Sequence, residues 1–187
     1  DADFLRRLWK RRGIAWFIRP GRASQAHDQD TPAHALVLTD DAFTLPQKAA
    51  GTVRYHRDDG TEQSDTVITW SAVRTLRPGN VSRQSWDYLQ SRPMTSNTSS
   101  RIDQGATGNQ FAASLDDYLI DMPHAGEDGD DYRKLGELRM KRHEYESKCF
   151  YGEGSVRALC VGEWVALTGH PDIDTHPENE REFVVTR

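Results

Sequence analysis

The stretch TVITWSAVRTLRPG, residues 66–79, decides the fold class of this chain. Apolar and polar side chains alternate along it, with Ile68, Trp70, Ala72 and Leu76 set against Thr69, Ser71 and Thr75. Because residues two apart lie on the same face of a β-strand, this period predicts a long strand with one face toward a core. Pro78-Gly79 is expected to end the strand, since proline cannot donate a ladder hydrogen bond.

Other segments on both sides of this strand extend a mainly β pattern. Further strands are predicted at 14–18, 34–39, 52–57, 81–89, 114–121 and 182–186, with a hairpin around Gly162 within 155–169. We expect the 81–89 segment to pair with the 66–77 strand. Turn and loop composition predicts loops at 19–33 and 170–181 and a turn at 58–60.

Helical periodicity appears twice. It predicts a helix over 3–12, which Gly13 ends, and a second helix over 131–148 with Asp130 or Asp131 as its cap. Tyr132, Leu135, Leu138 and Tyr145 are expected to line one face of the second helix, and His143 to be exposed. Together the segments predict an α+β fold, mainly β, in which a small α/β unit precedes an antiparallel β unit that carries one helix.

Length and composition exclude several classes of protein. The 187 residues suffice for one domain or two small ones. No apolar run approaches the roughly 20 residues that span a bilayer, and no secretory leader is evident, so we expect no stable membrane anchor and no signal peptide. Cys149 and Cys160 are too few for a disulfide scaffold; we expect two reduced thiols, with a single bridge as the alternative.

Charge is distributed unevenly. Residues 1–100 contain 14 basic and 11 acidic side chains, residues 101–187 contain 10 and 18, and the net charge is −5. An acidic protein is a poor general partner for nucleic acid. The first helix nevertheless carries a basic cluster, and its members are candidate interface residues together with an aromatic neighbour: Arg6, Arg7, Trp9, Lys10, Arg11 and Arg12. Their charge complements the acidic second half, either within one chain or between subunits.

The sequence contains few patterns that are typical of catalytic chemistry. The densest set of metal-ligand types lies in HPDIDTHPENE (170–180), where His170, Asp172, Asp174 and His176 are the candidates. A solvated loop is the favoured interpretation, because nothing in the segment fixes the direction of the ligands. No nucleophile elbow, HExxH motif or phosphate-binding loop occurs, and Asp116-Asp117 is interpreted as surface charge. We therefore expect no catalytic residue, no cofactor and no enzyme.

The order of the segments resembles a known family. DFLRRLWKRRGIAWFI opens the chain, HALVLTDD and TVITWSAVRTLRPGNVSRQSWDY follow, and EGSVRALCVGEWVALTGHP and EFVVTR close it. This series resembles the VgrG (valine-glycine-repeat) spike proteins of type VI secretion, and the baseplate hub proteins of contractile phage tails. The resemblance covers nearly all of the chain. One departure is Lys10-Arg11-Arg12, where the family usually has acidic residues before the glycine that ends the helix.

The resemblance implies a fold and a structural role. Residues 1–62 would be part of an α/β connector, and residues 63–187 a hub-type antiparallel β-barrel domain with a linker around 91–112 and a helix around 131–148. Because the chain begins with Asp1, we expect it to be a fragment, with a first barrel before it and a neck and needle after it. The family implies a homotrimer whose partners are the secreted tube protein, the baseplate and effector proteins.

The implied function is a hub fragment of the type VI secretion spike, which docks on the tube and helps puncture the target cell and deliver effectors. Such a protein is assembled in the bacterial cytoplasm and then exported to the extracellular space or a target cell. The alternatives are a phage or prophage tail baseplate hub, a stand-alone β-barrel module that binds glycan or nucleic acid, and a metal hydrolase built on the 170–180 loop.

Overall fold

The chain forms two compact units. The computed structural model describes residues 1–20, 34–57 and 64–186. Unit 1 comprises Asp1–Gly13 and Ala72–Phe150, and unit 2 comprises Ile14–Ser71 and Tyr151–Arg187. The expected division at residue 62 stays a prediction. The turn expected at 58–60, and the loop expected at 19–33 from residue 21 onward, lie outside the described residues.

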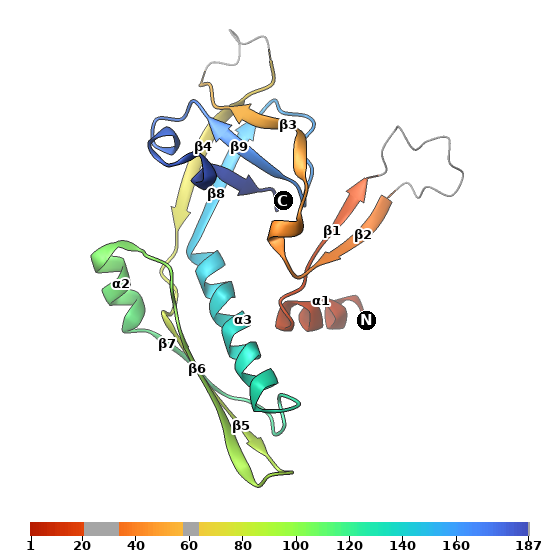
Figure 1. Cartoon of the computed structure of the whole chain (residues 1–187), viewed down its shortest axis with the longest axis vertical. Helices are drawn as coiled ribbons and strands as arrows, with labels where there is room; N and C mark the ends of the chain where they lie inside the picture. Colours follow the sequence, from red (N-terminus) through yellow and green to blue (C-terminus); the bar gives the residue numbers. More distant parts are fainter. Residues whose placement is uncertain (21–33, 58–63, 187) are drawn as a thin grey trace. The chain divides into compact units, whose positions relative to one another are not determined.

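Unit 1 is built on a three-stranded sheet with a long helix along it (Figure 1). Its elements are α1 (Ala2–Arg11), β5 (Asn80–Asp87), β6 (Arg92–Ser99), α2 (Gly105–Ala113), β7 (Asp116–Ile120) and α3 (Gly129–Ser147). The central strand β5 pairs antiparallel with β6 and parallel with β7. Helix α3 packs against β5 and β6, which buries one face of the sheet.

The core of unit 1 combines apolar side chains with small polar ones. Met94 of β6 clusters with Tyr132 and Leu135 of α3, and all three are buried. Ser85 and Ser96 on the same face of the sheet are 1% and 3% exposed. A Cβ atom added at Gly136 of α3 would overlap the Ser96 hydroxyl, so glycine and serine together allow the helix to approach the sheet closely.

The linker predicted over 91–112 is wrong. These residues form strand β6 and most of helix α2. Their Ser, Thr and Asn content resembles a linker, but the small side chains of β6 suit a face that lies close under α3. The partner predicted for the 81–89 segment is also wrong, because β5 pairs with β6 and β7.

Helix α3 lies where the sequence predicts a helix, although details differ. Its cap is Asp128, whose side chain accepts a hydrogen bond from the Asp131 backbone N–H, rather than Asp130 or Asp131. Tyr145 is 55% exposed and does not line the buried face. His143, expected in solvent, is only 8% exposed because the helix turns it toward the sheet.

Unit 2 contains a separate ribbon and a mixed sheet. In the ribbon, β1 (Ala15–Pro20) pairs antiparallel with β2 (His34–Thr39). In the sheet, β9 (Trp164–Thr168) lies between β10 (Glu182–Val184), which is antiparallel to it, and β3 (Gln47–Arg54), which is parallel. The core is apolar, with Phe17, Val53, Val67, Val165, Leu167 and Ile173 buried.

The decisive strand of the sequence is present as β4 (Val67–Arg74), which pairs with β8 (Lys148–Gly154). Both strands pass from one unit to the other along the chain. The alternation holds in the first half of β4, where Ile68 and Trp70 are half-buried and Thr69 and Ser71 exposed. The Trp70 indole meets the Phe183 ring edge-on at a centroid distance of 4.8 Å.

Two expectations about strand pairing are corrected. Residues 155–161 form no strand, so the hairpin around Gly162 is wrong, and β9 pairs with β3 and β10 instead. The pairings β3–β9 and β5–β7 are parallel, so the β structure is mixed where antiparallel pairing was expected. The closed barrel stays a prediction.

Other expectations from the sequence agree with the structure. The 170–181 segment is a loop with two short 3₁₀ turns, Ile173–Thr175 and Glu178–Glu180; a third such turn, Ala42–Thr44, follows β2. Cys149 and Cys160 are free thiols. Among the described residues, no helix is long and apolar enough to cross a membrane.

Candidate functional site

Helix α1 carries the basic cluster that the sequence singled out. Asp3 lies in its first turn and Lys10 and Arg11 in its last, which suits the helix dipole. Gly13, with φ +72°, follows the end of the helix. A Cβ atom at Gly13 would lie 2.6 Å from Leu138 Cδ2 of α3, and the positive φ independently favours glycine at this position.

Two of the basic residues attach α1 to the rest of unit 1. Arg12 Nη1 donates to Asp131 Oδ1 at 2.7 Å, and Arg11 Nη2 donates to the Ala125 carbonyl oxygen at 2.5 Å. Contact between the basic helix and the acidic second half is thereby confirmed within one chain. A role between subunits stays a prediction.

The other candidate residues of α1 make local contacts or line a pocket. Arg6 forms an ion pair with Asp3 at 3.1 Å, and Arg7 Nε donates to the Asp3 carbonyl oxygen at 3.3 Å. Trp9 is half-buried. Lys10 lines the pocket described below. Because Arg6, Arg7 and Lys10 are exposed, much of the positive charge of α1 is accessible to solvent.

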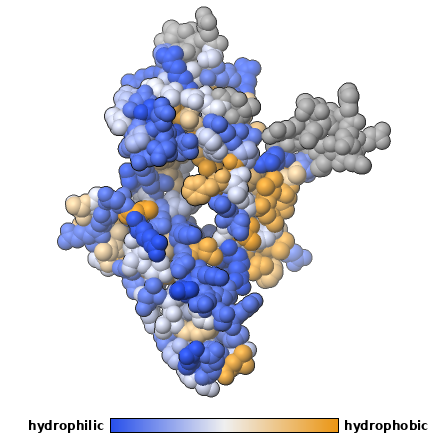
Figure 2. Space-filling view, in the orientation of Figure 1, coloured by the Kyte–Doolittle hydropathy of each residue, from blue (hydrophilic) through white to orange (hydrophobic). Residues whose placement is uncertain are grey.

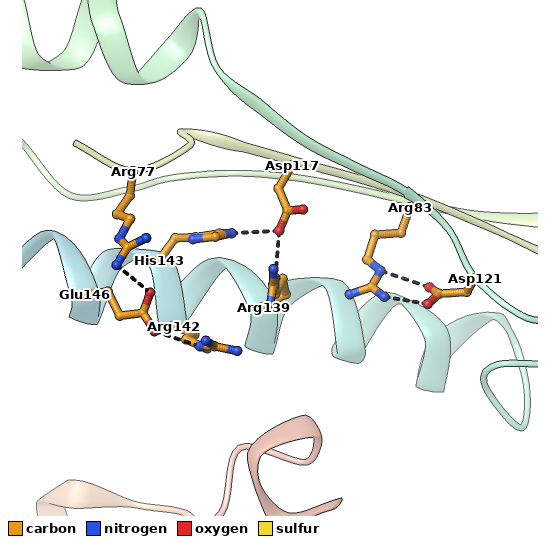
Figure 3. A network of polar contacts seen from close by, with 8 residues as sticks. All are labelled: Arg77, Arg83, Asp117, Asp121, Arg139, Arg142, His143 and Glu146. Atoms are coloured by element: carbon orange, nitrogen blue, oxygen red, sulfur yellow. Dashed lines mark hydrogen bonds and ion pairs between the residues drawn. The ribbon is translucent and has the colours of Figure 1, made fainter. Parts of the chain in front are cut away.

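A line of charged side chains runs between α3 and the strands of unit 1 (Figure 3). Arg139 Nε donates to Asp117 Oδ2 at 2.6 Å, and His143 Nε2 lies 2.8 Å from the same oxygen. One turn further along, Arg142 Nε donates to Glu146 Oε1 at 2.9 Å, and Arg77 Nη2 lies 3.2 Å from Glu146 Oε2. Asp117, interpreted from the sequence as surface charge, is therefore half-buried and doubly bonded.

The most buried arginine–carboxylate pair of the network is at Asp121. Arg83 of β5 donates to both of its carboxylate oxygens, from Nε at 2.9 Å and from Nη2 at 2.6 Å. The Tyr132 hydroxyl donates to Asp121 Oδ2 at 2.9 Å. The Arg83 and Asp121 side chains are 18% and 16% exposed. This bidentate pair joins β5 to the end of β7, and the Tyr132 hydroxyl links it to α3.

The network shifts the pKa values of its members in ways that match the contacts. Burial acts to raise the pKa of Asp117, but hydrogen bonds from His143 and Arg139 outweigh it and hold the pKa below 3.8. For Glu146, burial is outweighed mainly by Arg142, and its pKa is likewise lowered. The pKa of Asp131 is lowered by the Glu127 backbone N–H and by Arg12. Burial, with the bond to Asp121, raises the pKa of Tyr132.

We expect the free energy of unfolding to fall as the solution is acidified. Asp117, Glu146 and Asp131 have lower pKa values when folded, so at low pH the unfolded chain binds protons that the folded chain does not. Their contribution is complete above the ordinary carboxyl values of 3.8 and 4.5 and is lost as pH falls through the lowered folded values. Urea unfolding followed by tryptophan fluorescence between about pH 6 and about pH 3 measures this loss.

The Asp117→Asn variant serves as the control for that titration. It removes one of the three carboxylates, so the drop in stability between the two pH values should be smaller than in the parent chain. A drop of equal size would contradict the assignment of Asp117 to the acid response.

A pocket of about 250 Å³ lies within unit 1, among residues of α1, α3, β5 and the end of β7. Six of its lining residues are basic: Arg7, Lys10, Arg11, Arg83, Arg139 and Arg142. Leu135 and Leu138 supply its apolar part, and Asp121 is the acidic residue in the lining. This concentration of cations makes the pocket the strongest candidate binding site of unit 1.

The metal-ligand candidates lie in a loop whose polar groups bond to one another. His170 Nδ1 accepts hydrogen bonds from the backbone N–H groups of Asp172 and Ile173. Asp174 accepts from the Gly169 N–H and lies 3.6 Å from Arg181, while His176 lies 3.5 Å from Glu180. Among the described residues, no three metal-ligating side chains converge on one point.

The sequence interpretation found α1 but missed most of the network: Arg77, Arg83, Asp117, Asp121, Arg139, Arg142, His143 and Glu146. A signal was present, because four of these residues recur at the three- and four-residue spacing of a helix face: Arg139, Arg142, His143 and Glu146. Asp117 and Asp121 likewise lie on one face of β7 and its extension. Matching the two patterns would have required knowing that Asp117 of β7 bonds to Arg139 and His143 of α3.

Comparison with known proteins identifies relatives of this chain. The family model described as "Phage tail baseplate hub (GPD)" matches residues 1–187. A curated relative, the type VI secretion system spike protein VgrG1c of Pseudomonas aeruginosa, is 24% identical over 186 residues. The match covers 98% of this chain and 23% of the relative, so the chain spans about a quarter of that protein's length. The resemblance inferred from the order of the segments is thereby confirmed, and the chain belongs to the phage tail baseplate hub family.

Proposed function

We propose that this chain is a structural, non-enzymatic hub segment of a type VI secretion spike. It would trimerise, dock on the secreted tube, and help the spike puncture a target cell and deliver effectors. The observation that carries the proposal is the family match along all 187 residues, together with a relative named as a spike protein that aligns over nearly the same range. The protein would be assembled in the bacterial cytoplasm and then exported.

The β1–β2 ribbon supplies a surface suited to such an assembly. Trp16 pairs with Leu38 and Ile18 with Leu36 across the ribbon, so all four side chains lie on one face. Each is at least 40% exposed, and Figure 2 shows hydrophobic colour over β1 and β2. A contiguous apolar face of this kind is typical of a protein–protein contact. We assign it to a neighbouring copy of the chain in the trimer.

Replacing Leu36 with aspartate tests that assignment. We expect the variant of the whole polypeptide to lose most of its trimer at micromolar concentration, because a charge would be buried at an apolar contact. Mass photometry gives the oligomer distribution. Ala35→Asp is the matched control, since Ala35 is exposed on the opposite face of the same strand and should leave the trimer intact. Equal trimer loss in both variants, or loss in neither, would remove the ribbon from the interface.

The proposed role is tested in the bacterium that encodes the chain, by deleting these residues in frame. We expect the tube protein to disappear from the culture medium, while its amount inside the cells stays unchanged. Plasmid-borne expression of the intact gene should restore export. If export continues in the deletion strain, the secretion role is wrong.

The runner-up is a phage or prophage tail hub, which the family's own description favours. In that case the deletion should abolish infectious particles after prophage induction and leave tube-protein export unaffected. The two readouts come from the same strain, so a single deletion separates the candidates. Loss of neither would contradict both structural roles.

A further inference from the structure

Three arginines of the pocket in unit 1 are bonded through Nε alone. Arg139 and Arg142 use Nε for their bonds to Asp117 and Glu146, and Arg7 uses Nε for its bond to the Asp3 carbonyl oxygen. In the part of the chain that the structure describes, the terminal nitrogens of these three side chains have no partner. The internal bonds therefore use one nitrogen of each guanidinium group and leave the terminal donors available to a ligand.

Lys10 adds an ammonium group with the same property. It lines the pocket and makes no hydrogen bond or ion pair with any described residue. Four of the six cations of the pocket, Arg7, Lys10, Arg139 and Arg142, thus retain free donors. Arg83 is held at two nitrogens by Asp121, and Arg11 is bonded to a carbonyl oxygen.

The nearby carboxylates offset only part of this charge, although Glu146 also interacts electrostatically with Lys10. Asp121 is occupied by Arg83 and the Tyr132 hydroxyl, Asp117 by Arg139 and His143, and Glu146 by Arg142 and Arg77. Three carboxylates thus face six cations around the pocket. The excess of positive charge, with its donors pre-positioned, favours an anionic ligand.

We propose that this pocket binds a carboxylate-rich peptide segment of a partner protein. Guanidinium groups fixed at Nε present paired N–H donors that match the geometry of a carboxylate. Leu135 and Leu138 would contact the aliphatic parts of such a segment. This binding activity goes beyond the hub role, and it would hold whether or not the chain docks on a tube.

A nucleic acid fits the same site less well. The described lining contains no aromatic side chain on which a base could stack. A pocket of about 250 Å³ also lacks the length of a track for a phosphate backbone, and the whole chain is acidic at −5. These features favour a carboxylate-rich peptide over a nucleic acid as the ligand of the pocket.

The test is fluorescence anisotropy with a fluorescein-labelled peptide of sequence Glu-Leu-Glu-Glu-Leu-Glu, titrated with the 187-residue chain. The double variant Arg7→Gln/Lys10→Gln removes two exposed cations without breaking an ion pair of the core. We expect its Kd for the peptide to rise about tenfold, since each charged hydrogen bond contributes on the order of 1 kcal/mol or more.

A matched control removes the same charge elsewhere in unit 1. Arg133→Gln/Lys141→Gln changes two exposed residues of α3 that do not line the pocket, and its Kd should change less than about twofold. The corresponding Gln-Leu-Gln-Gln-Leu-Gln peptide should not bind. Equal weakening in both double variants, or undiminished binding of the glutamine peptide, would overturn the proposal.

A fluorescein-labelled oligothymidylate of twelve nucleotides tests the alternative that the pocket binds nucleic acid. If it binds more tightly than the glutamate peptide and responds to Arg7→Gln/Lys10→Gln, the site is a nucleic-acid site and the peptide proposal is wrong. The hub role is tested separately by tube-protein export. A negative result in the peptide-binding experiment therefore does not contradict the hub role, and a negative export result does not contradict peptide binding.

Discussion

Replacing Asp121 with alanine is expected to lower the free energy of unfolding by about 3 kcal/mol. The substitution leaves the Arg83 guanidinium, whose side chain is 18% exposed, without its bidentate partner. It also removes the acceptor of the Tyr132 hydroxyl, and Tyr132 is 1% exposed. A buried charge and a buried hydroxyl would then both lack partners. Urea unfolding monitored by circular dichroism measures the difference.

Asp116→Ala is the matched control, because Asp116 lies on β7, the strand that leads to Asp121, with its side chain exposed. We expect this change to alter stability by less than about 0.5 kcal/mol. The loss of stability in Tyr132→Phe should lie between the losses in Asp121→Ala and Asp116→Ala, since this substitution deletes only the hydroxyl. Similar losses for Asp121→Ala and Asp116→Ala would show that the Arg83–Asp121 pair does not stabilise unit 1.

Replacing Gly136 with leucine is expected to cost about 2–3 kcal/mol, although leucine is the better helix former by nearly 1 kcal/mol. The substitution is expected to destabilise the protein, despite the higher helix propensity of leucine, because the new side chain has no room between α3 and β6. A Cβ atom alone would overlap Ser96 Oγ and lie 3.2 Å from Ser96 Cβ. The rest of a leucine would push α3 away from β6 and expose Met94, Tyr132 and Leu135. Thermal unfolding should therefore begin at a lower temperature.

Gly129→Leu is the internal comparison for that prediction. Gly129 begins the same helix, and a Cβ atom there meets no atom within 4 Å. Its stability should change by less than about 0.5 kcal/mol or increase. If both glycines tolerate leucine equally, the close approach of α3 to β6 is not a feature of the folded chain.

The sequence predicted those elements whose own residues repeat at the spacing of a strand or a helix. The strands at 34–39 and 182–186 and the helices α1 and α3 have apolar residues at the spacing of their element, and they lie where expected. Strand β6 was missed because its buried face contains Ser96 beside Met94. Such a face becomes recognisable only when Gly136 of α3 is known to lie against it. The partners of the strands were predicted wrongly for the same reason, because strand pairing depends on contacts between segments that lie far apart in the sequence.

The candidate site shows the same limit. The basic residues of α1 were identified from the sequence alone. The ion pair between Arg12 and Asp131 agrees with the expected contact between this basic helix and the acidic second half of the chain. His143 was expected in solvent because its neighbours in sequence are charged. Its ring is nevertheless buried, since Asp117 from a distant strand supplies the acceptor. A contact between residues 26 positions apart has no signature in the local pattern of either segment.

The structural role is tested most directly by electron cryomicroscopy of the whole polypeptide that carries these residues, assembled with its tube protein. We expect three copies of residues 1–187 around one axis at the end of the tube, with each β1–β2 face in contact with a neighbouring copy. A reconstruction with one copy at the tube end, or with no density for these residues near the tube, would contradict it.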